Sequence, residues 1–232
     1  MADTTEVPAG EAGGTQLDEA RQGVVDTLTD ALGDAVLGSH VQPGHGSWLR
    51  VDRSAWTAAA EAAKYQLGCT FFEFLSAIDW APSPWGRYED AALEGAAPSL
   101  PEGPFETGYA GGDTRFQVVC RLANVRRHEE AHLNVVLKAD VPDDDLRIAS
   151  LVPLFSGASW HERECWEMFG ITFEGHPGLR HIYLPSGFEG NPLRKDFPLL
   201  ARLVKPWPGI VDVEPMPDEP PSGDGRTEEV AE

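Results

Sequence analysis

The chain has 232 residues, and its 41% of hydrophobic residues are enough to bury the core of one domain with extensions or of two small domains. Its formal net charge of -20 argues against a nucleic-acid-binding protein, because phosphate binding requires a concentrated Lys and Arg surface. No run approaches the roughly 18 apolar residues that cross a bilayer, and the N-terminus lacks the basic and then apolar pattern of a secretory signal, so we expect the protein to stay in the cytoplasm.

The first part of the chain is predicted to pass from disorder into helices and a strand. Residues 1–16 are rich in Gly, Thr, Ala and Glu and bury too little apolar surface to offset the entropy of ordering. Apolar residues near helical spacing predict a helix over residues 17–32, and an Ala-rich stretch predicts another over residues 54–66. Residues 48–51 are predicted as a short strand, whereas residues 69–80 fit either a strand or a helix.

The middle of the chain combines an irregular insertion with a predicted sheet. Residues 81–112 hold many Pro and Gly, which is the composition of a long irregular insertion. Partly alternating, β-branched runs over residues 115–125 and 132–139 predict a β-hairpin. A third strand over residues 146–152 is predicted to extend that sheet, and a helix is predicted to begin at Ser159.

The cysteine content excludes two kinds of site. Cys69, Cys120 and Cys165 are far apart in the sequence and odd in number, so they form neither a disulfide framework nor a CxxC metal site. Because an iron–sulfur cluster usually requires four thiolates, we expect this chain to hold none.

The polar stretch between the two predicted hairpin strands contains a zinc-peptidase string. His128, Glu129 and His132 spell HExxH, in which two His one helical turn apart bind zinc and the Glu activates water. The mechanism requires a helix, but these residues lie between two β-rich runs, where a loop would aim the imidazoles in different directions. A zinc hydrolase is therefore an alternative that the sequence disfavours.

The last third of the chain is predicted to form a helix and then an extended ribbon. Ser159, followed three residues later by Glu162, is a capping-box pattern that favours the start of a helix. Residues 173–199 are dense in Gly, Pro and aromatic residues, which specify fixed turns rather than repeating elements. Between His176 and Lys205, five basic residues stand against two acidic ones, so this stretch is net basic and suited to docking against a partner.

The run from Trp160 to Pro198 resembles the motif of the C-subunit family of NADH-quinone oxidoreductase, which is respiratory complex I. The sequence departs from the family pattern where Trp166 and Glu167 replace Tyr and Asp, and where His181 replaces Arg. The positions that agree or nearly agree are Glu162 to Glu164, Met168 to Ile171, Gly175 to Pro177, Leu179 and Arg180, Leu184 and Pro185, and Gly190 to Pro198.

The resemblance implies an α/β (α+β) fold, with an N-terminal mixed β-sheet domain and packed helices followed by an extended, mostly irregular C-terminal arm. It also implies a scaffold in the peripheral arm of the complex, on the cytoplasmic side of the cell membrane and attached to the membrane only through its partners. The chain's own arm would lie across the quinone-site D subunit, near the B, I and G subunits. This chain would bind no cofactor and supply no catalytic residue, while partner subunits hold the FMN and iron–sulfur clusters that pass electrons from NADH to quinone.

The resulting domain organisation has four parts. A disordered N-terminus over residues 1–16 precedes an α/β domain over residues 17–158, which carries the insertion at 81–112. The motif helix and the arm occupy residues 159–205, and residues 206–232 form an acidic, Pro-rich tail.

The charged and aromatic residues of the motif are the candidate partner-binding site. An equivalent subunit of a membrane-bound hydrogenase complex is an alternative, because the two kinds of complex share the ERE and RKDFP elements. In either complex we expect contacts with neighbouring subunits from Trp160, Glu162, Arg163, Glu164, Glu167, Phe169, His176, Pro177, Arg180, Arg194, Lys195 and Asp196.

Overall fold

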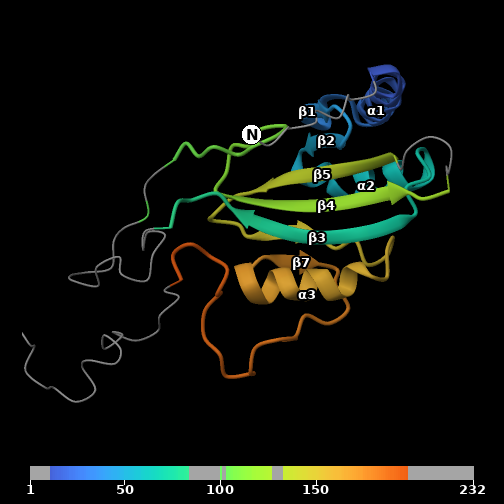
Figure 1. Ribbon diagram of the computed structural model, residues 1–232. Coiled ribbons are helices and arrows are strands. Elements are labelled where there is room, and N and C mark those ends of the chain that lie inside the picture. Colours follow the sequence, from blue (N-terminus) through green and yellow to red (C-terminus); the bar gives the residue numbers. More distant parts are fainter. Residues whose placement is uncertain (1–10, 84–99, 101–102, 127–132, 198–232) are drawn as a thin grey trace, which may run out of the picture.

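The computed structural model describes residues 11–83, 100, 103–126 and 133–197, and Figure 1 shows their arrangement. The helices are α1 (Glu11–Leu32), α2 (Trp56–Tyr65) and α3 (Ala158–Phe169). The strands are β1 (Val36–Gln42), β2 (Gly46–Val51), β3 (Phe71–Asp79), β4 (Phe116–Asn124), β5 (Leu133–Val141), β6 (Arg147–Ala149) and β7 (Thr172–Glu174).

The strands β1 to β5 form one sheet in the order β1-β2-β5-β4-β3. Neighbouring strands are antiparallel except β2 and β5, which run parallel, so the expected α/β fold with a mixed sheet is confirmed. The predicted hairpin strands are β4 and β5, in which Asn124 lies opposite Leu133 and Phe116 opposite Val141. The segment left open between strand and helix forms β3, which ends at Asp79.

One face of this sheet packs against the helices and forms the core. Alternate side chains of the central strands point to this face, because successive residues of a strand face opposite sides. Val118, Leu122 and Leu137 are fully buried there together with Leu28 of α1 and Trp56 of α2, and burial of each such side chain contributes about 1.5–3 kcal/mol. In Figure 1, α1 and α2 lie near the β1, β2 and β5 side of the sheet, and α3 runs beside β3.

The predicted third strand of this sheet was wrong. Residues 147–149 do form a strand, β6, but it pairs in parallel with β7 in a separate two-stranded sheet. Both edges of β5 are already occupied, by β2 on one side and β4 on the other, so the next strand along the chain has no free edge beside β5. Ser150 N instead donates a hydrogen bond of 2.9 Å to Glu174 O at the end of β7.

The helices differ from their predicted bounds at the N-terminal end. The helix α1 begins at Glu11 rather than at residue 17, so residues 11–16 are helical where the sequence predicted disorder. The helix α2 begins at Trp56, after a 3-10 turn in which Asp52 accepts a hydrogen bond from Ser54 N. Within the described ranges, no helix combines the length and the apolar character that crossing a bilayer would require.

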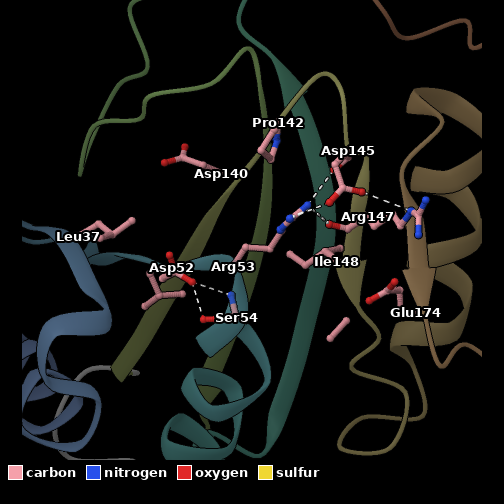
Figure 2. A pocket seen from close by; sticks show the side chains of 12 residues that line it. Leu37, Asp52, Arg53, Ser54, Asp140, Pro142, Asp145, Arg147, Ile148 and Glu174 are labelled. Carbon is pink, nitrogen blue, oxygen red and sulfur yellow. Dashed lines mark hydrogen bonds and ion pairs between the residues drawn. The ribbon is translucent and has the colours of Figure 1, made fainter.

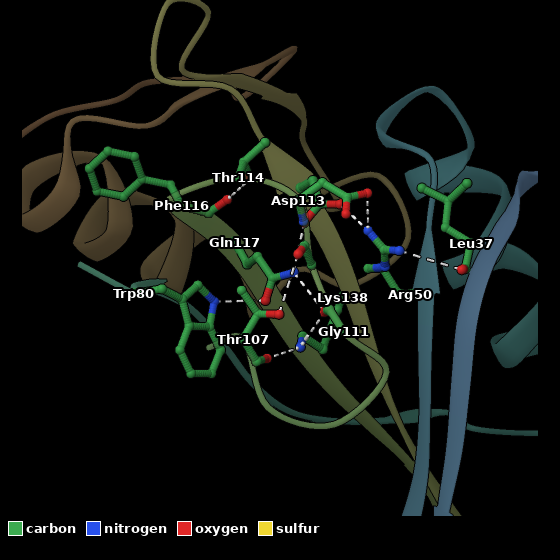
Figure 3. Close-up of polar contacts among 12 residues, drawn as sticks. Leu37, Arg50, Trp80, Thr107, Gly111, Asp113, Thr114, Phe116, Gln117 and Lys138 are labelled. Atoms are coloured by element: carbon green, nitrogen blue, oxygen red, sulfur yellow. Dashed lines mark hydrogen bonds and ion pairs between the residues drawn. The ribbon is translucent and has the colours of Figure 1, made fainter. Parts of the chain in front are cut away.

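The end of the predicted irregular insertion packs on the sheet face opposite the helices, as Figure 3 shows. Residues 103–113, called here the covering segment, form no helix or strand, yet side chains of the sheet hold them in place. Gln117 of β4 donates a hydrogen bond of 3.0 Å to Gly111 O, and Arg50 of β2 forms an ion pair of 2.7 Å with Asp113. The composition therefore predicted the irregular backbone but not its attachment.

Lys138 of β5 is the main attachment point of the covering segment. Its buried ammonium donates three hydrogen bonds of 2.7–3.0 Å to the carbonyls of Thr107, Tyr109 and Gly111 and lies 5.4 Å from the centroid of the Trp80 ring. Burial lowers the pKa of Lys138 to about 8, although the nearby Asp140 carboxylate opposes this shift. An ammonium has three donors, so the three carbonyls satisfy it completely.

Candidate partner interface

The helix α3 carries the family-type motif, but it does not begin as the sequence predicted. It starts at Ala158, and its N-cap residue Gly157 makes no side-chain capping bond. Ser159 lies inside the first turn, where its hydroxyl is 3.2 Å from Nε2 of His176. The predicted capping box between Ser159 and Glu162 was therefore wrong, because Glu162 bonds to the segment that precedes the helix.

Glu162 is a fully buried carboxyl group that ties α3 to the loop after β6. Its two oxygens accept hydrogen bonds of 2.6 Å from the Ser150 hydroxyl and from Leu151 N. Burial raises the pKa of Glu162 to about 7, while these two hydrogen bonds act in the opposite direction. The side chain is 0% exposed and therefore has no surface to offer a partner.

Replacement of Glu162 by Gln is expected to change the pH dependence of stability. The folded pKa of Glu162 is about 7 against 4.5 for an ordinary Glu, so its protonated form is stabilising at low pH and this stability is lost as the pH rises through 7. At every pH the neutral Gln can accept from Leu151 N through its oxygen and donate to the Ser150 hydroxyl through its NH₂ group. Relative to the wild type, the variant should therefore gain at most about 3 kcal/mol between pH 5 and pH 8 in urea unfolding. Parallel pH profiles for the two proteins would contradict this assignment.

Glu167, one and a half turns further along α3, accepts hydrogen bonds from the arm itself. Its carboxylate accepts backbone hydrogen bonds of 2.7–3.1 Å from Ile182, Tyr183 and Leu184, and one of 2.9 Å from His181 Nδ1. Burial acts to raise the pKa of Glu167, but the four donors outweigh it and hold that pKa below its ordinary value. The charged form of this carboxylate therefore fixes residues 181–184 beside the helix.

Arg163 binds the same part of the arm from the preceding turn of α3. Its guanidinium donates hydrogen bonds of 3.1 and 3.0 Å to the carbonyls of Arg180 and His181. The same guanidinium lies 5.0 Å from the centroid of the Trp160 ring, which stacks on it from the solvent side. Apart from the His181 ring, which bonds to Glu167, Arg163 and Glu167 thus hold this part of the arm through its backbone.

The C-terminal end of α3 holds a second part of the arm. Gly170 ends the helix in the left-handed conformation, with φ of 75°, and a Cβ there would collide with Arg194 and Asn191. Arg194 Nε donates a hydrogen bond of 2.6 Å to Phe169 O, and Asn191 Nδ2 donates one of 2.9 Å to Glu167 O. The last carbonyls of α3 are therefore satisfied by the arm, and glycine is required where the two meet.

The comparisons with known proteins connect this geometry to a family. The sequence pattern of the family described as "Respiratory-chain NADH dehydrogenase, 30 Kd subunit" matches residues 49–202. The chain belongs to this family. The match begins within β2 and includes the later strands, α3 and the described arm, so it covers much more than the motif that carries the resemblance.

Two curated relatives match a shorter part of the chain. The NADH-quinone oxidoreductase C/D subunit of Yersinia pestis (strain Pestoides F) is 41% identical over 95 residues, which are 41% of this chain and 15% of that protein. The C/D subunit of the same oxidoreductase from Klebsiella pneumoniae subsp. pneumoniae is 44% identical over 92 residues, which are 40% of this chain and 15% of that protein. The chain thus aligns with only a small part of the length of these relatives.

Two solved structures also match the chain. A chain of the membrane-bound sulfane sulfur reductase, an archaeal respiratory membrane complex, matches with a TM-score of 0.51 and 20% identity, over 78% of this chain and 86% of that one. A trypsin-resistant fragment of Nqo5 matches with a TM-score of 0.46 and 21% identity, over 67% of this chain and 98% of the fragment. The identity to the reductase chain is low, so the likeness to it concerns the fold alone.

The structure divides the motif residues of this family member into two groups. The inward group contacts other parts of the chain itself and consists of Glu162, Arg163, Glu167, Phe169, His176, Arg194 and Asp196. The remaining motif residues lie at the surface or half-buried and consist of Trp160, Glu164, Pro177, Arg180 and Lys195. Contacts with neighbouring subunits stay a prediction for both groups. The side chains of the second group are free of the contacts that occupy the first, in which Asp196 alone is exposed.

Some residues of the site carried no readable signal in the sequence. Tyr183 is 63% exposed and Trp160 is 62% exposed, yet the prediction included only Trp160. Asp79 and Arg115 bind the end of the arm although they lie far from it in the sequence. A polar residue at the end of a buried strand was the only hint for Asp79.

The other candidate sites of the sequence are the HExxH string and the three cysteines. His128, Glu129 and His132 of the HExxH string lie outside the described residues. Burial raises the pKa of the thiols of Cys69, Cys120 and Cys165. Over residues 11–83, 100, 103–126 and 133–197, no group of three His, Cys, Asp or Glu side chains could hold a metal ion.

The cavity shown in Figure 2 lies between the main sheet and β6 and has a volume of about 650 Å³. Arg53 lines this cavity and donates hydrogen bonds to the Asp145 carboxylate and to the carbonyls of Asp145 and Arg147. These contacts join the 3-10 turn before α2 to β6, so Arg53 connects the two sheets rather than facing an open anion site.

Proposed function

We propose that this chain is a non-catalytic scaffold subunit in the peripheral arm of a proton-translocating NADH-quinone oxidoreductase. Membership in the 30 kDa subunit family is the observation that carries the proposal. In this role the chain binds no cofactor, while partner subunits hold the FMN and iron–sulfur clusters that pass electrons from NADH to quinone. Its attachment to the cytoplasmic side of the cell membrane is indirect, through those partners.

The quinone-site D subunit is proposed as the chief partner, with the B, I and G subunits as further neighbours. The curated relatives carry the combined name C/D, which supports a position of this chain beside the D subunit. The construction of the arm supports the same role, because α3 holds its backbone through Arg163 and Glu167 and leaves large side chains outside. A surface fixed before binding loses less conformational entropy when a partner docks on it.

Trp160 and Tyr183 are proposed as the aromatic anchors of the interface. Both are more than half exposed, and both lie on segments that Arg163 and Glu167 hold together. Trp, Tyr and Arg side chains are the residue types that most often carry binding energy at interfaces. Exposed aromatic rings beside a buried ionic scaffold therefore fit a permanent subunit contact.

A pull-down from solubilised membranes tests the proposal. The tagged wild-type chain is expected to recover partner subunits together with NADH-quinone oxidoreductase activity. The double variant Trp160→Ala and Tyr183→Ala should recover at least about tenfold less of both, because loss of two anchors costs several kcal/mol. Tyr65→Ala is the matched control, since Tyr65 is 69% exposed on α2 and does not belong to the arm.

The outcomes separate the alternatives. Recovery of hydrogen-evolving activity without NADH oxidation would favour the membrane-bound hydrogenase instead. Recovery of the chain by itself, or equal recovery by the double variant and the wild type, would contradict the proposed interface.

A further inference from the structure

Asp79, at the end of β3, forms a buried acceptor site for the end of the arm. Its carboxylate, with a side chain that is 0% exposed, accepts hydrogen bonds of 2.8 and 2.6 Å from the Arg115 guanidinium. It also accepts one of 3.1 Å from Ala81 N and one of 2.8 Å from Lys195 N. The strand β3 thus binds the backbone of the arm at Lys195.

Arg115 and the end of α3 hold the two residues on either side of Lys195. Arg115 forms an ion pair of 3.2 Å with Asp196, and Arg194 donates to Phe169 O and lies 5.3 Å from the centroid of the Phe116 ring. The side chains of Arg194 and Asp196 are therefore occupied within the chain. That of Lys195 is exposed, and no carboxylate among the described residues pairs with it.

We propose that Asp79 and Arg115 are positioning residues: they form a socket that fixes residues 194–196 and presents the Lys195 ammonium to a carboxylate of the neighbouring subunit. This inference rests on the proposed function, because it needs a neighbour that covers the arm. A carboxylate is the expected partner, because it accepts hydrogen bonds from an ammonium and also carries the opposite charge. The chain has a formal net charge of -20 and therefore repels acidic sites on a neighbour in general. A fixed cation at the contact attracts one such site and so gives the contact its specificity.

Limited trypsin digestion of the purified full chain tests the socket. In the wild type, docking of Lys195 N on Asp79 should protect the bonds after Arg194 and Lys195. Asp79→Asn keeps the size of the side chain but removes its charge, so cleavage of these two bonds, followed by mass spectrometry, should be about tenfold faster. Asp145→Asn is the control, because Asp145 is also paired with an arginine, Arg53, at a distance from the arm. Unchanged cleavage in Asp79→Asn would overturn the socket.

A double-mutant cycle in the assembled complex tests the presentation of Lys195. Binding of the tagged chain to the remaining subunits should weaken about tenfold in Asp79→Asn and in Lys195→Gln, and Lys195→Arg should retain affinity. The double variant should bind as weakly as either single variant, because both changes remove the same contact. Multiplied effects in the double variant, or full affinity of Lys195→Gln, would overturn the positioning role.

Failure of this inference differs from failure of the proposed function. If Trp160→Ala with Tyr183→Ala left assembly intact while Asp79→Asn still exposed the arm to trypsin, the interface would be wrong and the socket right. If the aromatic double variant abolished assembly while Asp79→Asn and Lys195→Gln had no effect, the interface would be right and the socket wrong.

Discussion

Replacement of Glu167 by Gln is expected to lower the free energy of unfolding by about 3 kcal/mol at pH 7, because hydrogen bonds to a charged acceptor are worth about 1.5–3 kcal/mol each and this carboxylate accepts four. A Gln side chain has one acceptor oxygen, and its NH₂ group would face backbone N–H groups. Urea unfolding measures the loss. Faster amide hydrogen exchange at Ile182, Tyr183 and Leu184 would locate it in the arm.

The pH profile of the wild type provides an independent check on Glu167. Its folded pKa lies below its ordinary value, so its contribution to stability is present above the pKa of the unfolded chain and is lost as the pH falls through the folded pKa. On acidification Glu167→Gln should therefore gain stability relative to the wild type, whereas Glu162→Gln should lose stability relative to the wild type. Glu164→Gln, on the same helix and half-buried, should change stability by less than about 0.5 kcal/mol. An effect of Glu167→Gln as small as that of Glu164→Gln would show that the arm does not depend on the carboxylate.

Replacement of Lys138 by Met is expected to lower the free energy of unfolding by about 3 kcal/mol, because three carbonyls of the covering segment lose their donor in a site closed to solvent. Met is similar in length and apolar, so the change removes the hydrogen bonds with little change in volume. Urea unfolding measures the total effect. A change in tryptophan fluorescence at low urea would report release of the segment beside Trp80.

Lys64→Met is the matched control for Lys138→Met. Lys64 Nζ donates a single hydrogen bond, to Leu154 O, from a part-buried position on α2. Its loss should cost about 1 kcal/mol. Equal losses in the free energy of unfolding for the two variants would show that the three hydrogen bonds of Lys138 do not stabilise the covering segment more than one hydrogen bond would.

The positions of several strands could be predicted from local sequence pattern, but the order in which the strands pair could not. The β-branched run over Phe116–Asn124 and that over Leu133–Val141 identified β4 and β5 correctly, because both the alternation and the composition are local properties. The parallel pairing of β2 with β5 was not predictable, since it joins segments separated by α2, β3 and β4. The misplaced third strand follows from this, because only the insertion of β2 beside β5 removes the free edge.

The site shows a similar division between residue type and environment. Glu162 and Glu167 are the same residue type on one helix, and the sequence assigned both to partner contacts. Their pKa values shift in opposite directions, because burial outweighs the two donors that precede α3 at Glu162, whereas the four donors that follow α3 outweigh burial at Glu167. Long-range contacts therefore decided the role of each carboxylate, whereas the motif could only indicate that this helix was important.

The central place of β5 also bears on how the chain folds during its synthesis. The hairpin of β1 and β2 leaves the ribosome early, but the strand that must lie beside β2 is completed only with Val141. At a translation rate of about 5–20 residues per second, β2 waits on the order of ten seconds with an unpaired edge. During this interval the free edge of β2 can pair with a wrong strand.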